Sequence, residues 1–150
     1  MSDIDDGLPN IIGQTEKLEI STKFTSHTHS GAILSKMNEL RSEEYDVEII
    51  ATEKVIKAHR LVLKSASSYF AAMFNSGMKE SESNKIQVDF EYDIMAPLVD
   101  FLYTGELTVN SDNVYGLYQA SDFYEISTAR SFCSQFLVNT LGLSQKAVRY

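Results

Sequence analysis

The sequence predicts a helix-rich α+β domain, in which a cluster of helices is flanked by a small three-stranded sheet. A chain of 150 residues is long enough to bury a substantial core, since a domain of this size hides roughly 70% of its unfolded surface. Hydrophobic residues make up 43% of the chain and charged residues 23%, which is typical of a globular domain. Stretches with a helical apolar period dominate and the alternating stretches are short, so the helices must pack on one another.

The first element is expected after an acidic lead. Residues 1–16 contain both Gly and Pro and show no apolar period, so we expect them to be disordered. The run 17–24 alternates apolar and polar residues, which predicts a weak strand. In residues 33–40, apolar side chains recur at i, i+4 and i+7 after a segment containing Gly and Ser, which predicts a helix.

A hairpin is predicted next. Residues 46–50 and 55–57 carry short apolar patterns on either side of a polar turn at 52–54, which is typical of two antiparallel strands. A short helix is expected over residues 58–64, where three apolar residues follow one another.

The middle of the chain combines helices with one more strand. Ser67 is a predicted N-cap, because its hydroxyl can accept from the backbone N–H groups of a helix over residues 69–74. In residues 86–90, apolar and polar side chains alternate, which predicts a strand. A strongly amphipathic helix is expected over residues 95–104, ended by Gly105.

The C-terminal third is predicted to be mostly helical. A short edge strand is expected at residues 107–109, followed by a helix capped by Asp112 and a last helix capped by Ser127. We place the domain at residues 17–141 and a C-terminal tail at residues 142–150.

Charge and composition exclude several classes of function. Thirteen basic residues against 21 acidic ones give a net charge of −8 and a pI near 4.8, so binding to nucleic acid or anionic lipid is not expected. The single cysteine suits a reducing compartment, and the sequence shows no signal peptide and no apolar run of the roughly 20 residues that span a bilayer. We therefore expect a cytoplasmic or nuclear protein without membrane contact.

The sequence carries no recognisable catalytic or metal-binding motif. His27 and His29 form an H-x-H pair without a further ligand nearby, which favours a solvated polar segment. His59 lies where a strand meets a helix, and we expect its imidazole to hydrogen-bond a free backbone carbonyl. Cys133 falls on the apolar stripe of a helix, which predicts core packing. No enzyme activity, cofactor or small-molecule substrate is expected.

Seven motifs, in one collinear order, point to surface recognition instead. They are D-V at 46–47, A-H-R-L-V-L at 58–63, S-x-Y-F-x-A-M-F at 67–74, G-M-K-E-S at 77–81, D-F-L-Y-T-G-E-L at 100–107, N-V at 113–114 and C-x-x-F-L at 133–137. Together they resemble a BTB/POZ domain, and particularly that of the BTB-Kelch adaptor proteins.

The resemblance implies the BTB/POZ fold and a homodimer. In the family, the first long helix packs on its two-fold mate, and here that helix would contribute Ile33, Leu34 and Met37. An N-terminal strand can cross to the partner's sheet, which would bring in Leu18 and Ile20. Spacing alone fits equally well a helix packed within its own chain, so the dimer rests on the resemblance.

The resemblance also implies a binding site for the N-terminal domain of cullin-3, the scaffold of a RING-type E3 ubiquitin ligase. Met78 and Glu80 match a hydrophobic-x-Glu motif of such adaptors, and an apolar anchor beside a carboxylate can hold and cap a partner helix. Phe74 and Tyr124 are the further expected contacts. The alternative is that Met78 folds over Phe74 and that Glu80 is simply solvated.

Asp46 and Arg60 match the family's paired charges near the dimer groove. We expect a buried, hydrogen-bonded structural pair. The alternative is a charged pocket for corepressor peptides, as in BTB dimers that act in transcriptional repression, and a pure self-association domain is a third interpretation.

The resemblance leaves the extent of the protein open. The family continues into a helical BACK region, so residues 142–150 are expected to be the start of a BACK region that is truncated or absent. A fragment of a BTB-BACK-Kelch protein and a natural BTB-only form both fit.

Overall fold

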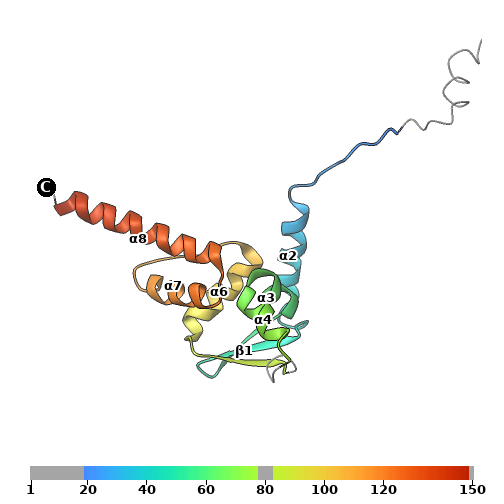
Figure 1. The fold of residues 1–150 in the computed structure, drawn as a ribbon, viewed down its shortest axis with the longest axis horizontal. Helices are drawn as coiled ribbons and strands as arrows, with labels where there is room; N and C mark the ends of the chain where they lie inside the picture. Colours follow the sequence, from blue (N-terminus) through green and yellow to red (C-terminus); the bar gives the residue numbers. More distant parts are fainter. Residues whose placement is uncertain (1–18, 78–82, 149–150) are drawn as a thin grey trace, which may run out of the picture.

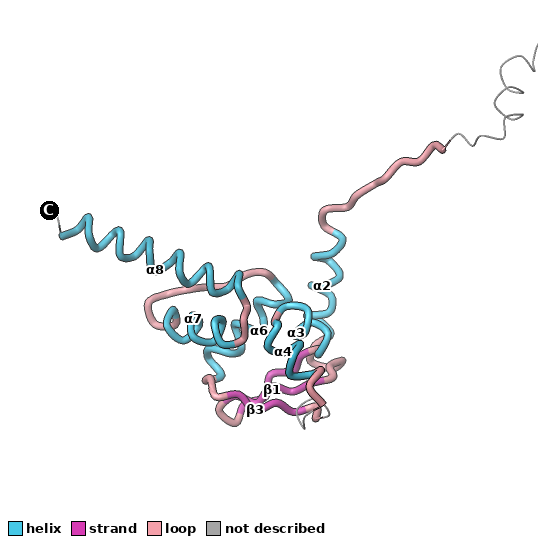
Figure 2. The backbone as a smooth tube through the Cα atoms, in the orientation of Figure 1, coloured by secondary structure: helices cyan, strands magenta, loops and turns pink. Residues whose placement is uncertain are grey.

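A computed structural model of the chain describes residues 19–77 and 83–148. In chain order, the elements of this part are α2 (His29–Leu40), β1 (Val47–Ala51), β2 (Lys54–Ala58), α3 (Arg60–Ala66), α4 (Ser68–Phe74), β3 (Lys85–Val88), α6 (Tyr92–Thr104), α7 (Val114–Phe123) and α8 (Ser127–Val148). The strands gather on one side of the helical cluster, and α8 runs outward past the other helices (Figures 1 and 2). The predicted α+β class with a three-stranded sheet is confirmed.

The sheet has the strand order β2-β1-β3. Strands β1 and β2 form the predicted antiparallel hairpin, with Ala51 opposite Lys54, and β3 pairs parallel to β1. Thr52 and Glu53 make the two-residue turn with φ of 50° and 66°. Both lie in the left-handed region, which the twist of a two-residue hairpin requires.

One hydrophobic core lies between the sheet and the helices. Every second residue of the central strand β1 is fully buried, as the pleat of a half-covered strand dictates. The helices supply the rest of the core, which includes Leu63, Phe70, Met95, Leu98, Val99, Leu117, Ala129 and Cys133.

Two glycines in the helical cluster have structural roles. Gly105 ends α6 with φ 73°, and its N–H donates to the Phe101 carbonyl at 2.7 Å. Gly116 lets α7 approach α6 closely, because a Cβ atom at this position would lie 2.5 Å from Ile94 Cδ1.

Two predicted strands do not form within the described single chain. From residue 19 to residue 24 the backbone forms no strand with its own chain, and its crossing to the sheet of a partner stays a prediction. Residues 105–110 form an irregular connection, in which Leu107 and Val109 are half-buried against the core. Their alternation therefore reflects packing onto the core rather than pairing in a sheet.

Several helix boundaries also differ from the prediction. Helix α3 begins at Arg60 because Ala58 still belongs to β2, and α6 begins at Tyr92, one turn early. Asp112 does not cap α7; the N-cap position is Asn113, and the Asn110 side chain accepts from the N–H groups of both residues. None of the helices in residues 19–77 and 83–148 is long and apolar enough to cross a bilayer.

Candidate functional site

A groove of about 420 Å³ runs between helix α4 and strand β3. The walls come from both elements and from the end of α7, with Tyr69, Phe70, Ala72, Met73, Ser76, Ile86, Gln87, Val88 and Tyr124 as lining residues. In the sequence, the two walls are joined by residues 75–84, so the segment that holds Met78 and Glu80 connects them.

Ser67 fixes the position of α4 against the α7–α8 turn. Its Oγ accepts from the Phe70 N–H at 3.1 Å, which is the predicted N-cap bond, and its hydroxyl donates to the carbonyl of Tyr124. Ser67 is almost fully buried. Because a buried hydroxyl without partners is unfavourable, this pair of bonds holds two distant segments in one arrangement.

Stacked aromatic rings form the floor of the groove. The Phe70 and Tyr124 rings are parallel with centroids 4.8 Å apart, and Tyr69 meets Tyr124 edge-on at 5.3 Å. Tyr124 is only 3% exposed, and its burial, with a smaller contribution from Tyr69, raises the pKa of its phenol well above the usual value. The shift therefore extends the uncharged state of this phenol, which any tyrosine has at neutral pH, into the alkaline range.

The predicted cullin-binding residues do not all reach this groove. Tyr124 lines it, whereas Phe74 is buried behind Phe70, with the Arg60 guanidinium 5.0 Å from its ring centre. Met78 and Glu80 lie outside the described residues.

Five exposed or half-buried groove residues were not selected by the sequence analysis: Tyr69, Ala72, Met73, Ser76 and Gln87. Tyr69 and Met73 stand at i and i+4 on α4, and Ser76 lies two residues beyond its end, so a second stripe at helical spacing was the available signal. It was hidden because the same helix also carries the core stripe that includes Phe70 and Phe74.

A second, apolar cleft of about 310 Å³ lies between α2, α3 and α6. Two of the predicted dimer residues, Leu34 and Met37, line it and are half-buried. Ile33 is 52% exposed and Leu61, which the sequence analysis did not select, is 70% exposed. Ile20 is exposed in the N-terminal coil, and Leu18 lies outside the described residues.

Asp46 and Arg60 are joined differently from the expected buried pair. The Asp46 carboxylate is exposed and accepts from the backbone N–H of Arg60 at 2.7 Å, at the start of α3. The Arg60 guanidinium donates to the Ser83 carbonyl instead and covers the Phe74 ring. The contact is thus a helix-start bond, which explains why the carboxylate need not be buried.

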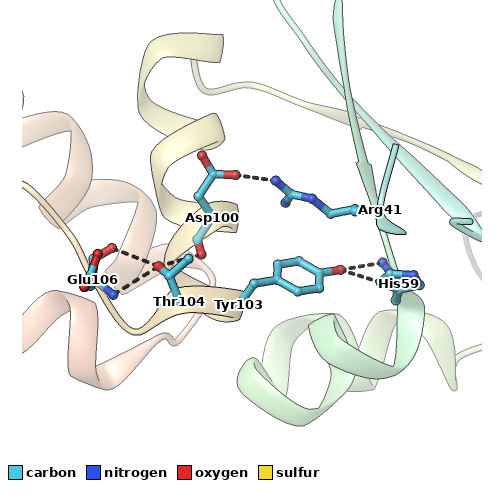
Figure 3. A network of polar contacts seen from close by, with 6 residues as sticks. All are labelled: Arg41, His59, Asp100, Tyr103, Thr104 and Glu106. Carbon is cyan, nitrogen blue, oxygen red and sulfur yellow. Dashed lines mark hydrogen bonds and ion pairs between the residues drawn. The ribbon is translucent and has the colours of Figure 1, made fainter. Parts of the chain in front are cut away.

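His59 belongs to a structural network that also contains Tyr103, Arg41 and Asp100 (Figure 3). Its Nε2 lies 2.6 Å from the Glu44 carbonyl and must be the donor, since a carbonyl only accepts. A neutral ring then accepts the Tyr103 hydroxyl at Nδ1, over 2.8 Å. The expected structural role of His59 is confirmed.

In residues 19–77 and 83–148, no three His, Cys, Asp or Glu side chains are grouped so that they could hold a metal ion. Cys133 is fully buried as predicted, and burial raises the pKa of its thiol.

Comparisons with known proteins agree on one family. A sequence profile of the BTB/POZ domain matches residues 37–141. Human Kelch-like protein 3 is 39% identical over 132 residues, which cover 86% of this chain and 22% of that protein. Bovine Kelch-like protein 13 is 34% identical over 135 residues, covering 87% and 21%. The chain thus spans about a fifth of the length of the curated relatives it matches.

Solved structures show the same fold. The BTB domain of zebrafish PATZ1 superimposes with a TM-score of 0.71 at 22% identity, covering 79% of this chain and 99% of that one. The BTB domain of human gigaxonin also gives a TM-score of 0.71, at 19% identity, and covers 79% and 98%.

Proposed function

Because this chain belongs to the BTB/POZ domain family, we propose that it homodimerises and binds the N-terminal domain of cullin-3, as part of a substrate adaptor of a cullin-RING ubiquitin ligase. The family's domain is a protein-interaction module rather than a catalytic fold. The Kelch-like relatives favour the adaptor role over transcriptional repression. The proposal concerns the BTB domain and leaves the ubiquitination substrate open.

The groove between α4 and β3 is the observation that carries the cullin proposal. It offers a rigid aromatic floor and an adaptable rim with Met73 and Tyr69, which suits the apolar face of a partner helix. Met78 and Glu80 belong to the segment that joins the groove walls. There they would add an apolar anchor and a carboxylate, which a helix N-terminus attracts.

The apolar cleft of α2, α3 and α6 supports the homodimer. Ile33 and Leu61 present large apolar side chains to solvent next to the half-buried Leu34 and Met37. Contiguous exposed apolar surface on a small domain marks an interaction site. A second copy offers the same patch, and such self-complementary surfaces close as two-fold dimers.

Titration calorimetry against the cullin-3 N-terminal domain tests the proposal. We expect Met78→Ala, Glu80→Ala and Tyr69→Ala each to weaken Kd about tenfold or more, equivalent to about 1.4 kcal/mol. Tyr115→Ala, an exposed tyrosine of α7, is the matched control and should stay within about twofold. The absence of binding by a sample that light scattering shows to be dimeric would reject the cullin role and leave the dimer proposal intact.

A further inference from the structure

The described part of the chain holds four side chains that a mild oxidant attacks: the thiol of Cys133 and the thioethers of Met37, Met73 and Met95. Cys133 and Met95 are buried in the core. A peroxide reacts with the thiolate of a cysteine, and burial both shields Cys133 and raises the pKa of its thiol. Within this set, oxidation therefore falls on Met37 or Met73.

These two methionines line the two apolar surfaces of the molecule. Met37 is half-buried in the α2–α3–α6 cleft, which the proposed second copy covers. Met73 is half-buried in the wall of the α4–β3 groove, so its side chain can be reached while the groove is empty. In the proposed dimer, Met73 is thus the oxidisable side chain of residues 19–77 and 83–148 that stays open to solvent.

The end of α4 holds Met73 at the groove. The hydroxyl and the N–H of Ser76 donate to the Met73 carbonyl at 2.7 and 3.3 Å, which closes the last turn of the helix around this residue. Tyr69 lies one turn earlier and lines the same groove, and Ile86 and Val88 line it from β3. A docking helix therefore meets the Met73 side chain among apolar and aromatic neighbours.

We infer that Met73 is a redox-sensitive modification site, at which a hydroperoxide converts the thioether to a sulfoxide and thereby lowers the affinity of the groove for its partner. The effect on affinity rests on the proposed cullin site, whereas the reactivity of Met73 does not.

The chemical step needs only the thioether and a hydroperoxide. The sulfur attacks the outer oxygen, the O–O bond breaks and an S=O bond forms, so two electrons pass from sulfur to the peroxide. The inner oxygen takes up the proton of the attacked hydroxyl and leaves as water or as an alcohol. A methionine sulfoxide reductase reverses the change with two electrons from thiols and releases water.

The sulfoxide changes the chemistry of the groove wall. It places a polar acceptor where the free chain has a flexible apolar side chain. The neighbouring polar groups already have partners, since the Ser76 hydroxyl donates to the Met73 carbonyl and the Gln87 amide donates to the Ile50 carbonyl at 3.3 Å. When an apolar partner face covers the groove, the sulfoxide oxygen loses its water, which is unfavourable.

Treatment of the full chain with hydrogen peroxide, followed by peptide mass mapping, tests the site. We expect Met73 to form the sulfoxide at least about tenfold faster than Met95, with Cys133 unmodified over the same time. The cullin-3 N-terminal domain, added before the peroxide, should slow the oxidation of Met73 because it covers the groove. Equal rates for Met73 and Met95 in the chain alone would overturn the inference.

Titration calorimetry against the cullin-3 N-terminal domain, after removal of the peroxide, tests the effect on affinity. All chains carry Met78→Leu, which keeps the hydrophobic residue of the motif and removes its sulfur. Peroxide should weaken the Kd of this background about tenfold or more, and a sulfoxide reductase should restore it. The added change Met73→Leu should make the Kd insensitive to peroxide, whereas Met37→Leu, the matched control in the cleft, should leave the sensitivity in place.

Two results of the titration would overturn the inference. One is an unchanged Kd for a background chain whose Met73 is fully oxidised, and the other is an equal loss of affinity with and without Met73→Leu. The absence of binding by the untreated wild-type chain would instead reject the cullin site and the effect on affinity with it, while the mass map still decides whether Met73 is the reactive residue.

Discussion

The α4–β3 groove and the α2–α3–α6 cleft both present apolar side chains, but the chain supports the two in different ways. In the groove, Phe70 and Tyr124 stack on each other and are buried by their own chain. In the cleft, Leu61 is 70% exposed, and Ile33, which precedes the cleft residue Leu34 in α2, is 52% exposed. The groove is thus shaped before any partner arrives, whereas the apolar surface of the cleft is buried only when another molecule covers it.

The difference separates two kinds of energetic effect. A side chain already packed within the chain contributes to folding, since removing it leaves a cavity. An exposed side chain contributes little to folding and much to association. Substitutions in the groove floor should therefore change the stability of one chain, and substitutions in the cleft should change how copies associate.

Phe70→Ala should have the largest effect on folding. Phe70 is 1% exposed and touches rings on both sides, so we expect a loss of about 3–5 kcal/mol in the free energy of unfolding. Leu61→Ala, a truncation at an exposed position, is the matched control and should cost less than about 1 kcal/mol. Urea denaturation at a protein concentration low enough to keep both samples monomeric measures the difference, because unfolding of a dimer would also include the loss of Leu61 contacts across the proposed interface. Similar losses for both variants would abolish the distinction between the two surfaces.

Leu61→Asp should act on association instead. A carboxylate in the centre of a dimer interface is desolvated without a partner, so we expect the dimer to weaken by about 2 kcal/mol or more. Light scattering across a concentration series should show the monomer mass for the variant and the dimer mass for the wild type at micromolar concentration. Val138→Asp on the outer part of α8, at a comparably exposed position, is the control. A monomeric wild-type chain would contradict the proposed dimer.

Sequence reasoning recovered what local patterns determine. The hairpin around Thr52 and Glu53, the N-cap at Ser67 and the apolar stripe of α6 all depend on residues that are close in sequence. Residues 107–109 were misjudged because alternation reports burial on one side and does not reveal whether the other side pairs with a strand or packs on a core.

The groove was harder to predict because it depends on contacts between distant segments. The Ser67 bond to Tyr124 spans 57 positions, and no local pattern places these two residues together. Phe74 was expected at the binding surface. The aromatic residues of α4 supply both the core and the groove, and only the tertiary packing determines that Phe74 is buried while Tyr69 lines the groove. The roles of Met78, Glu80, Leu18 and Ile20 stay predictions.

Ser67→Ala should lower the folding stability by an intermediate amount, because it removes the bonds that hold α4 at one end of the groove. It removes the N-cap of α4 and leaves the Tyr124 carbonyl without its buried donor, which should cost about 1–3 kcal/mol of folding stability. Ser65→Ala, which removes only an exposed bond to the Leu61 carbonyl, should change stability by less than about 0.5 kcal/mol. Thermal unfolding compares the two, and equal shifts in Tm would show that the tie between α4 and Tyr124 is not structural.

Tyr124→Phe should have the smallest effect near neutral pH and a visible one in alkali. Because burial raises the pKa of Tyr124 in the folded chain, the unfolded chain releases this proton first as the pH passes 10. The folded state then binds more protons than the unfolded state, so stability falls with rising pH, by up to about 1.4 kcal/mol per pH unit for this one group.

Tyr124→Phe keeps the ring that stacks on Phe70 and removes the titrating group. Its loss of stability between pH 9 and 11 should therefore be smaller than that of the wild type, with the remaining slope including Tyr103, whose pKa burial also raises. Parallel pH profiles for the two proteins would mean that the Tyr124 phenol reaches water, and the groove would then lack the closed aromatic floor that distinguishes it from the cleft.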